Sequence, residues 1–104
     1  MSEDVTIIDV KKYLIVGNRK KLKKTILDEL DKGKRKFIVD FSEALYVDSS
    51  GLGVLLFISK KIDEQGGELR LASLNGGLRT LFELTKLDTN FKIVESCEES
   101  LKDI

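Results

Sequence analysis

Two adjacent serines beside an aspartate form the segment of this chain that is best suited to chemistry. The segment runs Asp48-Ser49-Ser50-Gly51-Leu52-Gly53 and precedes an apolar pattern that predicts a helix. The first N–H groups of a helix have no intrahelical partner, and the helix dipole is positive at that end. A phosphate carried by either serine would therefore be stabilised. The same residue types are also ordinary helix N-caps, a structural role that requires no function.

The spacing of apolar residues predicts alternating strands and helices along the chain. Continuous or β-branched apolar runs are typical of strands, and apolar residues three and four positions apart are typical of amphipathic helices. Gly33 and Gly66-Gly67 follow the expected ends of two helices, and Asn75 can cap a third. Strands are expected at 5–10, 13–16, 37–41, 69–74 and 91–94, and helices at 22–30, 52–62 and 78–82, with a short final helix after a capping box at 96–99.

This order of elements predicts an α/β fold. The strand–helix–strand unit over 37–74 requires a crossover, so its two strands should be parallel neighbours. The first two apolar runs, on either side of Lys11-Lys12, suggest a hairpin that would add an antiparallel pair. We therefore expect one domain over residues 1–104, with a mixed sheet of about five strands and helices packed against it. Residues 42–47 are expected to form a loop. The serine motif would then lie beyond the carboxyl end of a strand, where open α/β sheets bind ligands.

Composition narrows the classes of function. No apolar run approaches the ~20 residues needed to span a bilayer, and the acidic N-terminus has no signal-peptide pattern, so we expect a cytoplasmic protein without membrane insertion. The single Cys97 cannot form an internal disulfide. The chain has no His, which removes the commonest general base and metal ligand. We expect no metal, no cofactor and no catalytic residue. Asp40 is expected to hold nearby backbone N–H groups at the end of its strand.

Positive charge is concentrated in the first part of a chain whose net charge is zero. Residues 1–40 carry 11 Lys or Arg and seven Asp or Glu. Four cations crowd the start of the first predicted helix, where they oppose the helix dipole: Arg19, Lys20, Lys23 and Lys24. They form either a solvated face or a basic patch that meets an acidic partner. The basic stretches lack interleaved aromatic residues, so direct binding of nucleic acid is not expected.

The serine motif and its surroundings resemble a known family. The run Val47-Asp48-Ser49-Ser50-Gly51-Leu52-Gly53-Val54 resembles the phosphorylation motif of bacterial anti-sigma factor antagonists, which belong to the sulfate transporter and anti-sigma factor antagonist (STAS) domain family. The resemblance covers roughly residues 36 to 102, in the family's order. It extends to the segments 37–41, 66–69, 78–87, 91–94 and 98–101.

The resemblance implies a regulator that switches partners and is not itself an enzyme. In such a cycle the unphosphorylated protein binds an anti-sigma factor that is also a serine kinase, and so frees a sigma factor. The kinase phosphorylates the second motif serine, Ser50, with Ser49 as the second choice, and a serine phosphatase restores the binding form. The implied partner-binding residues are Asp48, Ser49, Ser50, Gly51 and Leu52, to which we add the basic patch Arg19, Lys20, Lys23 and Lys24.

One segment departs from the family, and two other functions stay open. The family usually has a longer turn before the first helix; here Gly17-Asn18-Arg19-Lys20-Lys21 is contracted, and Asn18 is expected to cap the helix. The first alternative function is a constitutive STAS subunit of a transport complex or a signalling scaffold. The second is a small enzyme or nucleotide-binding domain, although Gly51-Leu52-Gly53 lacks the length and the Lys of a phosphate-binding P-loop.

Overall fold

The computed structural model describes residues 5–14 and 17–98, which form six strands and three helices. The α/β class expected from the sequence is confirmed. The elements are β1 (Val5–Asp9), β2 (Lys12–Leu14), α1 (Arg19–Asp31), β3 (Lys36–Asp40), β4 (Ala44–Val47), α2 (Ser49–Glu64), β5 (Glu68–Ala72), α3 (Gly76–Leu84) and β6 (Lys92–Val94). None of these helices is long and apolar enough to cross a membrane.

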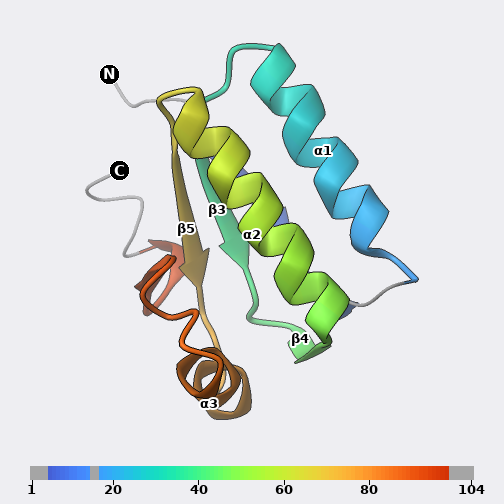
Figure 1. Ribbon diagram of the computed structural model, residues 1–104, viewed down its shortest axis with the longest axis vertical. Helices are drawn as coiled ribbons and strands as arrows, with labels where there is room; N and C mark the ends of the chain where they lie inside the picture. The colour runs from blue at the N-terminus through green and yellow to red at the C-terminus, as the bar shows by residue number, and fades with distance from the viewer. Residues whose placement is uncertain (1–4, 15–16, 99–104) are drawn as a thin grey trace.

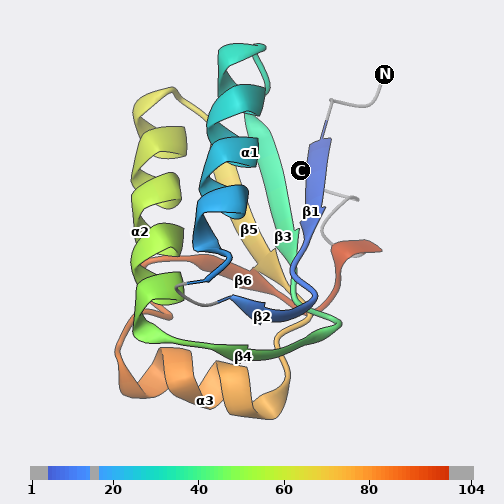
Figure 2. The ribbon, with the colours of Figure 1, turned by 90° about the vertical axis from the view of Figure 1, so that its right-hand side faces the viewer.

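The described strands form two separate sheets. The larger sheet has the order β1-β3-β5-β6, and the smaller one pairs β2 with β4. Every pair in both sheets is parallel. The predicted parallel pairing on either side of the second helix is confirmed, with Phe37 opposite Leu69 in β3 and β5. Helices α1 and α2 lie side by side on one face of the larger sheet (Figures 1 and 2).

The predicted antiparallel hairpin at the start of the chain is wrong. Strand β1 pairs with β3 instead, and the Val10 N–H extends that pairing by donating to the Asp40 carbonyl at 2.9 Å. Lys12 adopts a left-handed φ of 64°, and its N–H donates to the Glu43 carbonyl at 3.0 Å. Strand β2 therefore leaves the larger sheet and pairs with β4. A tight hairpin favours Asn or Gly at the turn, and the two lysines lack this preference.

The main core lies between the larger sheet and the two helices on its face. Helix α1 contributes buried Leu22, Ile26 and Leu30, and α2 contributes Leu55, Ile58 and Ile62. These side chains pack against apolar residues of β3 and β5, among them Phe37, Val39 and Leu71. The two helices expected at 22–30 and 52–62 are confirmed. Because α1 and α2 run opposite to the strands, both helices begin at the carboxyl end of the sheet (Figures 1 and 2).

Helix α3 is fastened to the strand that leads into the serine motif. Asn75 Oδ1 accepts from the Leu78 N–H at 2.8 Å, which confirms the predicted N-cap. The Asn75 Nδ2 group donates to the Ala44 carbonyl in β4 at 3.1 Å. At the other end of α3, the Phe82 ring meets Phe91 edge to face with centroids 5.7 Å apart. The predicted final helix extends past residue 98 and the second predicted strand includes 15–16, so both lie partly outside the described residues.

Candidate functional site

The serine motif lies at the N-terminus of α2, as the sequence predicts. Asp48 has the extended backbone of an N-cap residue, and its Oδ1 accepts from the Gly51 N–H at 2.8 Å. The same oxygen accepts from the Ser50 hydroxyl at 2.6 Å. The helix begins at Ser49, three residues before the predicted start, because the motif itself forms the first turn. One carboxylate oxygen therefore organises both the helix start and one of the two hydroxyls.

The two serines are in different environments. Ser49 is exposed, whereas Ser50 is half-buried and its hydroxyl is held by Asp48. Of the first N–H groups of the helix, that of Gly51 is already bonded to Asp48. The N–H groups of Ser49 and Ser50 belong to the first turn, which has no intrahelical acceptors, so they can stabilise an added anion.

Gly51 and Leu52 are buried beneath the serines and position them. A Cβ on Gly51 would lie 2.3 Å from the Leu14 carbonyl oxygen and 2.9 Å from Val47 Cγ1. The Asp48 N–H donates to the same Leu14 carbonyl at 3.1 Å. The start of α2 is thus seated directly on β2 and β4, and only a residue without a side chain fits at this contact.

The basic residues of α1 lie at the same end of the molecule as the serine motif (Figures 1 and 2). Arg19 is half-buried and Lys20 is exposed. Lys24 Nζ pairs with Asp28 at 3.0 Å, and Lys23 Nζ lies 4.4 Å from the centroid of the Phe57 ring in α2. Two of the four cations therefore already have a neighbour on α1 or α2.

The predicted capping role of Asn18 is wrong. Asn18 occupies the N-cap position of α1, but its side chain makes no capping hydrogen bond. Its Nδ2 group donates instead to the Tyr13 carbonyl at 2.7 Å, which ties the helix start to β2. The amide is therefore used for a contact between elements.

Strand β4 and its exposed apolar side chains were missed, because residues 42–47 were expected to form a loop. Leu45 and Tyr46 are 67% and 54% exposed, and Tyr13, the register partner of Tyr46 in β2, is 45% exposed. These side chains lie on the strands that seat the serine motif. The run Ala44-Leu45-Tyr46-Val47 is apolar and contains residues that favour strands, so a signal was present but short.

The other candidate residues have structural roles. Asp40 accepts from the Ser42 N–H at 3.0 Å and from its hydroxyl at 3.2 Å, which confirms the predicted role at the strand end. Burial raises the pKa of the Cys97 thiol, and the Asp40 and Asp9 carboxylates raise it further, so this thiol is poorly suited to act as a nucleophile. Over 5–14 and 17–98, no group of three or more His, Cys, Asp or Glu could hold a metal ion.

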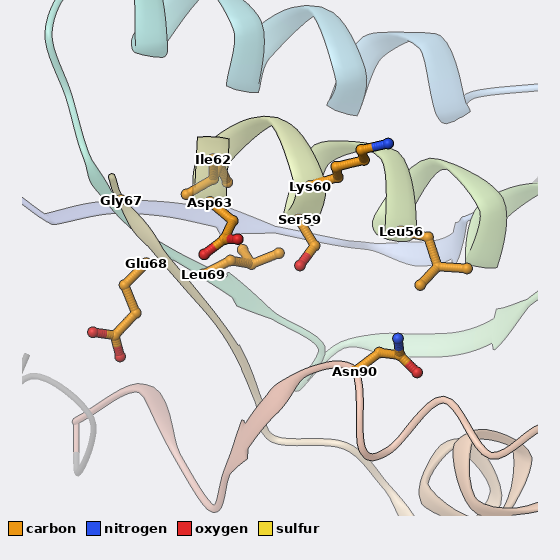
Figure 3. A pocket seen from close by; sticks show the side chains of 9 residues that line it. All are labelled: Leu56, Ser59, Lys60, Ile62, Asp63, Gly67, Glu68, Leu69 and Asn90. Atoms are coloured by element: carbon orange, nitrogen blue, oxygen red, sulfur yellow. The ribbon is translucent and has the colours of Figure 1, made fainter. Parts of the chain in front are cut away.

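An open pocket of about 610 Å³ lies on α2 away from the motif. Its lining combines Leu56, Ser59 and Asp63 of α2 with Glu68 and Leu69 of β5 and with Asn90 (Figure 3). The polar side chains are spread around the pocket (Figure 3), an arrangement that defines no ligand chemistry.

Three comparisons with known proteins agree with this geometry. A profile described as the STAS domain matches residues 1–100. A Thermotoga maritima protein named as a candidate anti-sigma factor antagonist is 34% identical over 103 residues, which cover 98% of this chain and 91% of that protein. The crystal structure of the candidate antagonist TM1081 from Thermotoga maritima has a TM-score of 0.91 at 33% identity, covering 100% of this chain and 90% of that one.

A more distant solved structure shares the fold. It is the Bacillus cell fate determinant SpoIIAA in its phosphorylated form, which is 19% identical, with a TM-score of 0.76. The match covers 99% of this chain and 92% of SpoIIAA.

Proposed function

This chain belongs to the STAS domain family of anti-sigma factor antagonists, and from that premise we propose that it switches partners through phosphorylation of Ser50. The unphosphorylated form binds an anti-sigma factor that is also a serine kinase. Phosphorylation by that kinase dissociates the complex, and a serine phosphatase reverses the modification. The protein acts in the cytoplasm as a substrate and ligand, and the kinase supplies the ATP site.

The observation that carries this proposal is the hydrogen bond from the Ser50 hydroxyl to the N-cap carboxylate of Asp48 at 2.6 Å. A phosphate on Ser50 removes the hydroxyl proton that makes this bond and brings about −1.5 to −2 charges beside a carboxylate. The first-turn N–H groups offset part of this repulsion within the free protein. In a complex that covers the motif, the same charge must be buried against the partner, where an unpaired charge costs about 2–5 kcal/mol.

The relatives support the proposal at two levels. The Thermotoga maritima relative is named as a candidate anti-sigma factor antagonist and aligns over almost the whole of both chains. The SpoIIAA structure of the same fold is of a phosphorylated form. A phosphorylation switch in this chain is therefore consistent with a modification known on the fold, and the two hydroxyls at the start of α2 offer the place for it.

Phosphate mapping tests the proposed modification. The protein is incubated with Mg·ATP and each purified serine kinase of the anti-sigma factor class encoded in the source genome, and phosphate is located by fragmentation mass spectrometry. We expect one phosphate, on Ser50, and none on a Ser50→Ala variant that retains Ser49. Phosphate confined to Ser49, Ser42 or Ser59 would refute the assignment. Stable binding without any phosphate on the motif would favour a constitutive subunit of a transport complex or scaffold.

Charge reversal tests the proposed basic patch. Arg19 and Lys20 form the start of α1, at the same end as the serines, so changing both to Glu should slow association with the kinase several-fold at low salt. The effect should shrink at high salt, because the screening length falls below ~8–10 Å. Stability should hold or rise slightly, since acidic groups suit a helix N-terminus. The measurement is the association rate against ionic strength, together with a melting curve.

The matched control for this experiment is Lys34→Glu with Lys86→Glu, which changes the net charge equally away from the start of α1. Equal slowing by both pairs would assign the effect to net charge. Unchanged rates in the Arg19 and Lys20 variant at low salt would leave these residues as a solvated face without a partner.

A further inference from the structure

Gly53 is an exposed glycine inside a helix, and no packing contact in the described part of the chain requires it. A Cβ built on Gly53 meets no atom within 4 Å, whereas one on Gly51 would meet the Leu14 carbonyl oxygen at 2.3 Å. Gly53 is absent from the residues with positive φ and lies in regular α2. Glycine in a helix interior is less stable than alanine. This position therefore carries a cost in stability that no contact among residues 5–14 and 17–98 explains.

One turn further along α2, Phe57 presents an aromatic ring to solvent. The residue is 36% exposed. Lys23 Nζ from α1 lies 4.4 Å from the ring centroid, and Lys61 Nζ from α2 lies 5.6 Å away. Both ammonium groups lie within the roughly 6 Å over which the face of an aromatic ring attracts a cation. Aromatic residues, Phe among them, are enriched in protein interfaces relative to the rest of the surface.

The spacing places these residues on one side of α2. Positions 50, 53, 57, 60 and 61 follow the three- and four-residue intervals that share a helix face. We call this set the α2 stripe: Ser50, Gly53, Phe57, Lys60 and Lys61. Gly53, Phe57, Lys60 and Lys61 are exposed, and Ser50 is half-buried. Along the helix the stripe presents the Ser50 hydroxyl first and then Gly53, which has no side chain. The Phe57 ring and the ammonium groups of Lys60 and Lys61 follow.

We propose that the α2 stripe is the docking surface for an acidic segment of the kinase, whose backbone crosses α2 at Gly53. This inference rests on the proposed function and extends its interface two turns beyond the serines. The missing side chain lets the partner backbone approach closely enough to reach the Ser50 hydroxyl. A carboxylate on the same segment meets Lys23 and Lys61 beside the Phe57 ring. Charge complementarity selects an acidic segment, because Lys60 and Lys61 belong to the stripe and Lys23 of α1 lies over its Phe57 ring. Lys61 also lies 3.8 Å from Glu64 of its own helix.

Filling the gap at Gly53 tests the proposal. Gly53→Gln adds a long side chain from a residue that favours helices, so the melting temperature should rise by a few degrees. Affinity for the purified kinase that phosphorylates Ser50 should nevertheless fall at least tenfold, and so should that of Phe57→Ala. A matched control is Gly76→Gln at the start of α3, where an added Cβ also meets no atom within 4 Å. The control should bind the kinase as the wild-type protein does.

The outcomes separate this inference from the proposed function. If the wild-type protein binds the kinase and is released on phosphorylation, but Gly53→Gln binds within twofold of wild type, the docking surface is wrong and the switch stands. An equal loss in Gly53→Gln and Gly76→Gln would also overturn it, since the effect would not be local. If no kinase binds or modifies the wild-type protein, the switch and the docking surface both fail.

Discussion

Replacing Ser50 with aspartate is expected to lower affinity for the kinase at least 30-fold, while Ser50→Ala stays bound and resists release by ATP. An unpaired charge buried in an interface costs about 2–5 kcal/mol, which corresponds to roughly 30-fold or more in the dissociation constant. The substituted carboxylate stands next to the Asp48 oxygen that now accepts the Ser50 hydroxyl at 2.6 Å. Alanine adds no charge and offers no oxygen to the kinase. The measurement is calorimetric affinity with and without Mg·ATP.

The folded state should tolerate both substitutions. A carboxylate in the first turn gains about 0.3–1 kcal/mol from the helix dipole, which offsets repulsion from Asp48. Losing the hydroxyl in Ser50→Ala removes one hydrogen bond, worth about 0.5–1.5 kcal/mol. Ser49→Asp is the matched control, because this substitution adds the same charge one residue away, at a position that is exposed. If Ser50→Asp binds as tightly as wild type, or if it unfolds, phosphate cannot act by the proposed route.

That a helix begins at the serine motif could be predicted from the sequence because the signal is local, although α2 starts at Ser49, three residues before the predicted start. Asp48 is a residue type that caps helices, and the apolar residues that follow it have helical spacing. The parallel pairing of β3 with β5 was also predictable, since a strand, a helix and a strand in succession favour one crossover. These features depend on neighbours in the chain or on a general rule of handedness, so no long-range contact had to be known.

The pairing of the first two strands could not be predicted in the same way. Strand β2 is three residues long and pairs with β4, which itself lacked a clear signal. Which of several short apolar runs pair with one another depends on how they pack in three dimensions, and hydrophobic pattern alone does not specify it. The same limit applies to the site. Nothing in the sequence distinguishes Gly51 from Gly53. The structure shows that Gly51 is enclosed and that Gly53 faces open space.

The difference between these two glycines leads to the largest expected effect on stability. Gly51→Ala should lower the free energy of unfolding by about 3 kcal/mol, at the upper end of the cost of overpacking a core. The new Cβ would lie 2.3 Å from the Leu14 carbonyl oxygen, and this backbone atom cannot rotate away as a side chain can. Relief therefore requires α2 to move off β2. Such a shift would also strain the bond from the Asp48 N–H to the same carbonyl.

Gly53→Ala is the matched control, because it makes the same chemical change two residues later in the same helix. No atom lies within 4 Å of its added Cβ, so stability should rise by up to about 1 kcal/mol. Urea unfolding of both variants measures the change in the free energy of unfolding, which should be negative for Gly51→Ala and positive for Gly53→Ala. At a temperature where Gly51→Ala is still folded, the kinase should also modify Ser50 more slowly, because the displaced first turn no longer presents the hydroxyl beside Asp48. Equal stability of the two variants would show that the start of α2 is not seated on β2, and the geometry assigned to the serine pair would have to be abandoned.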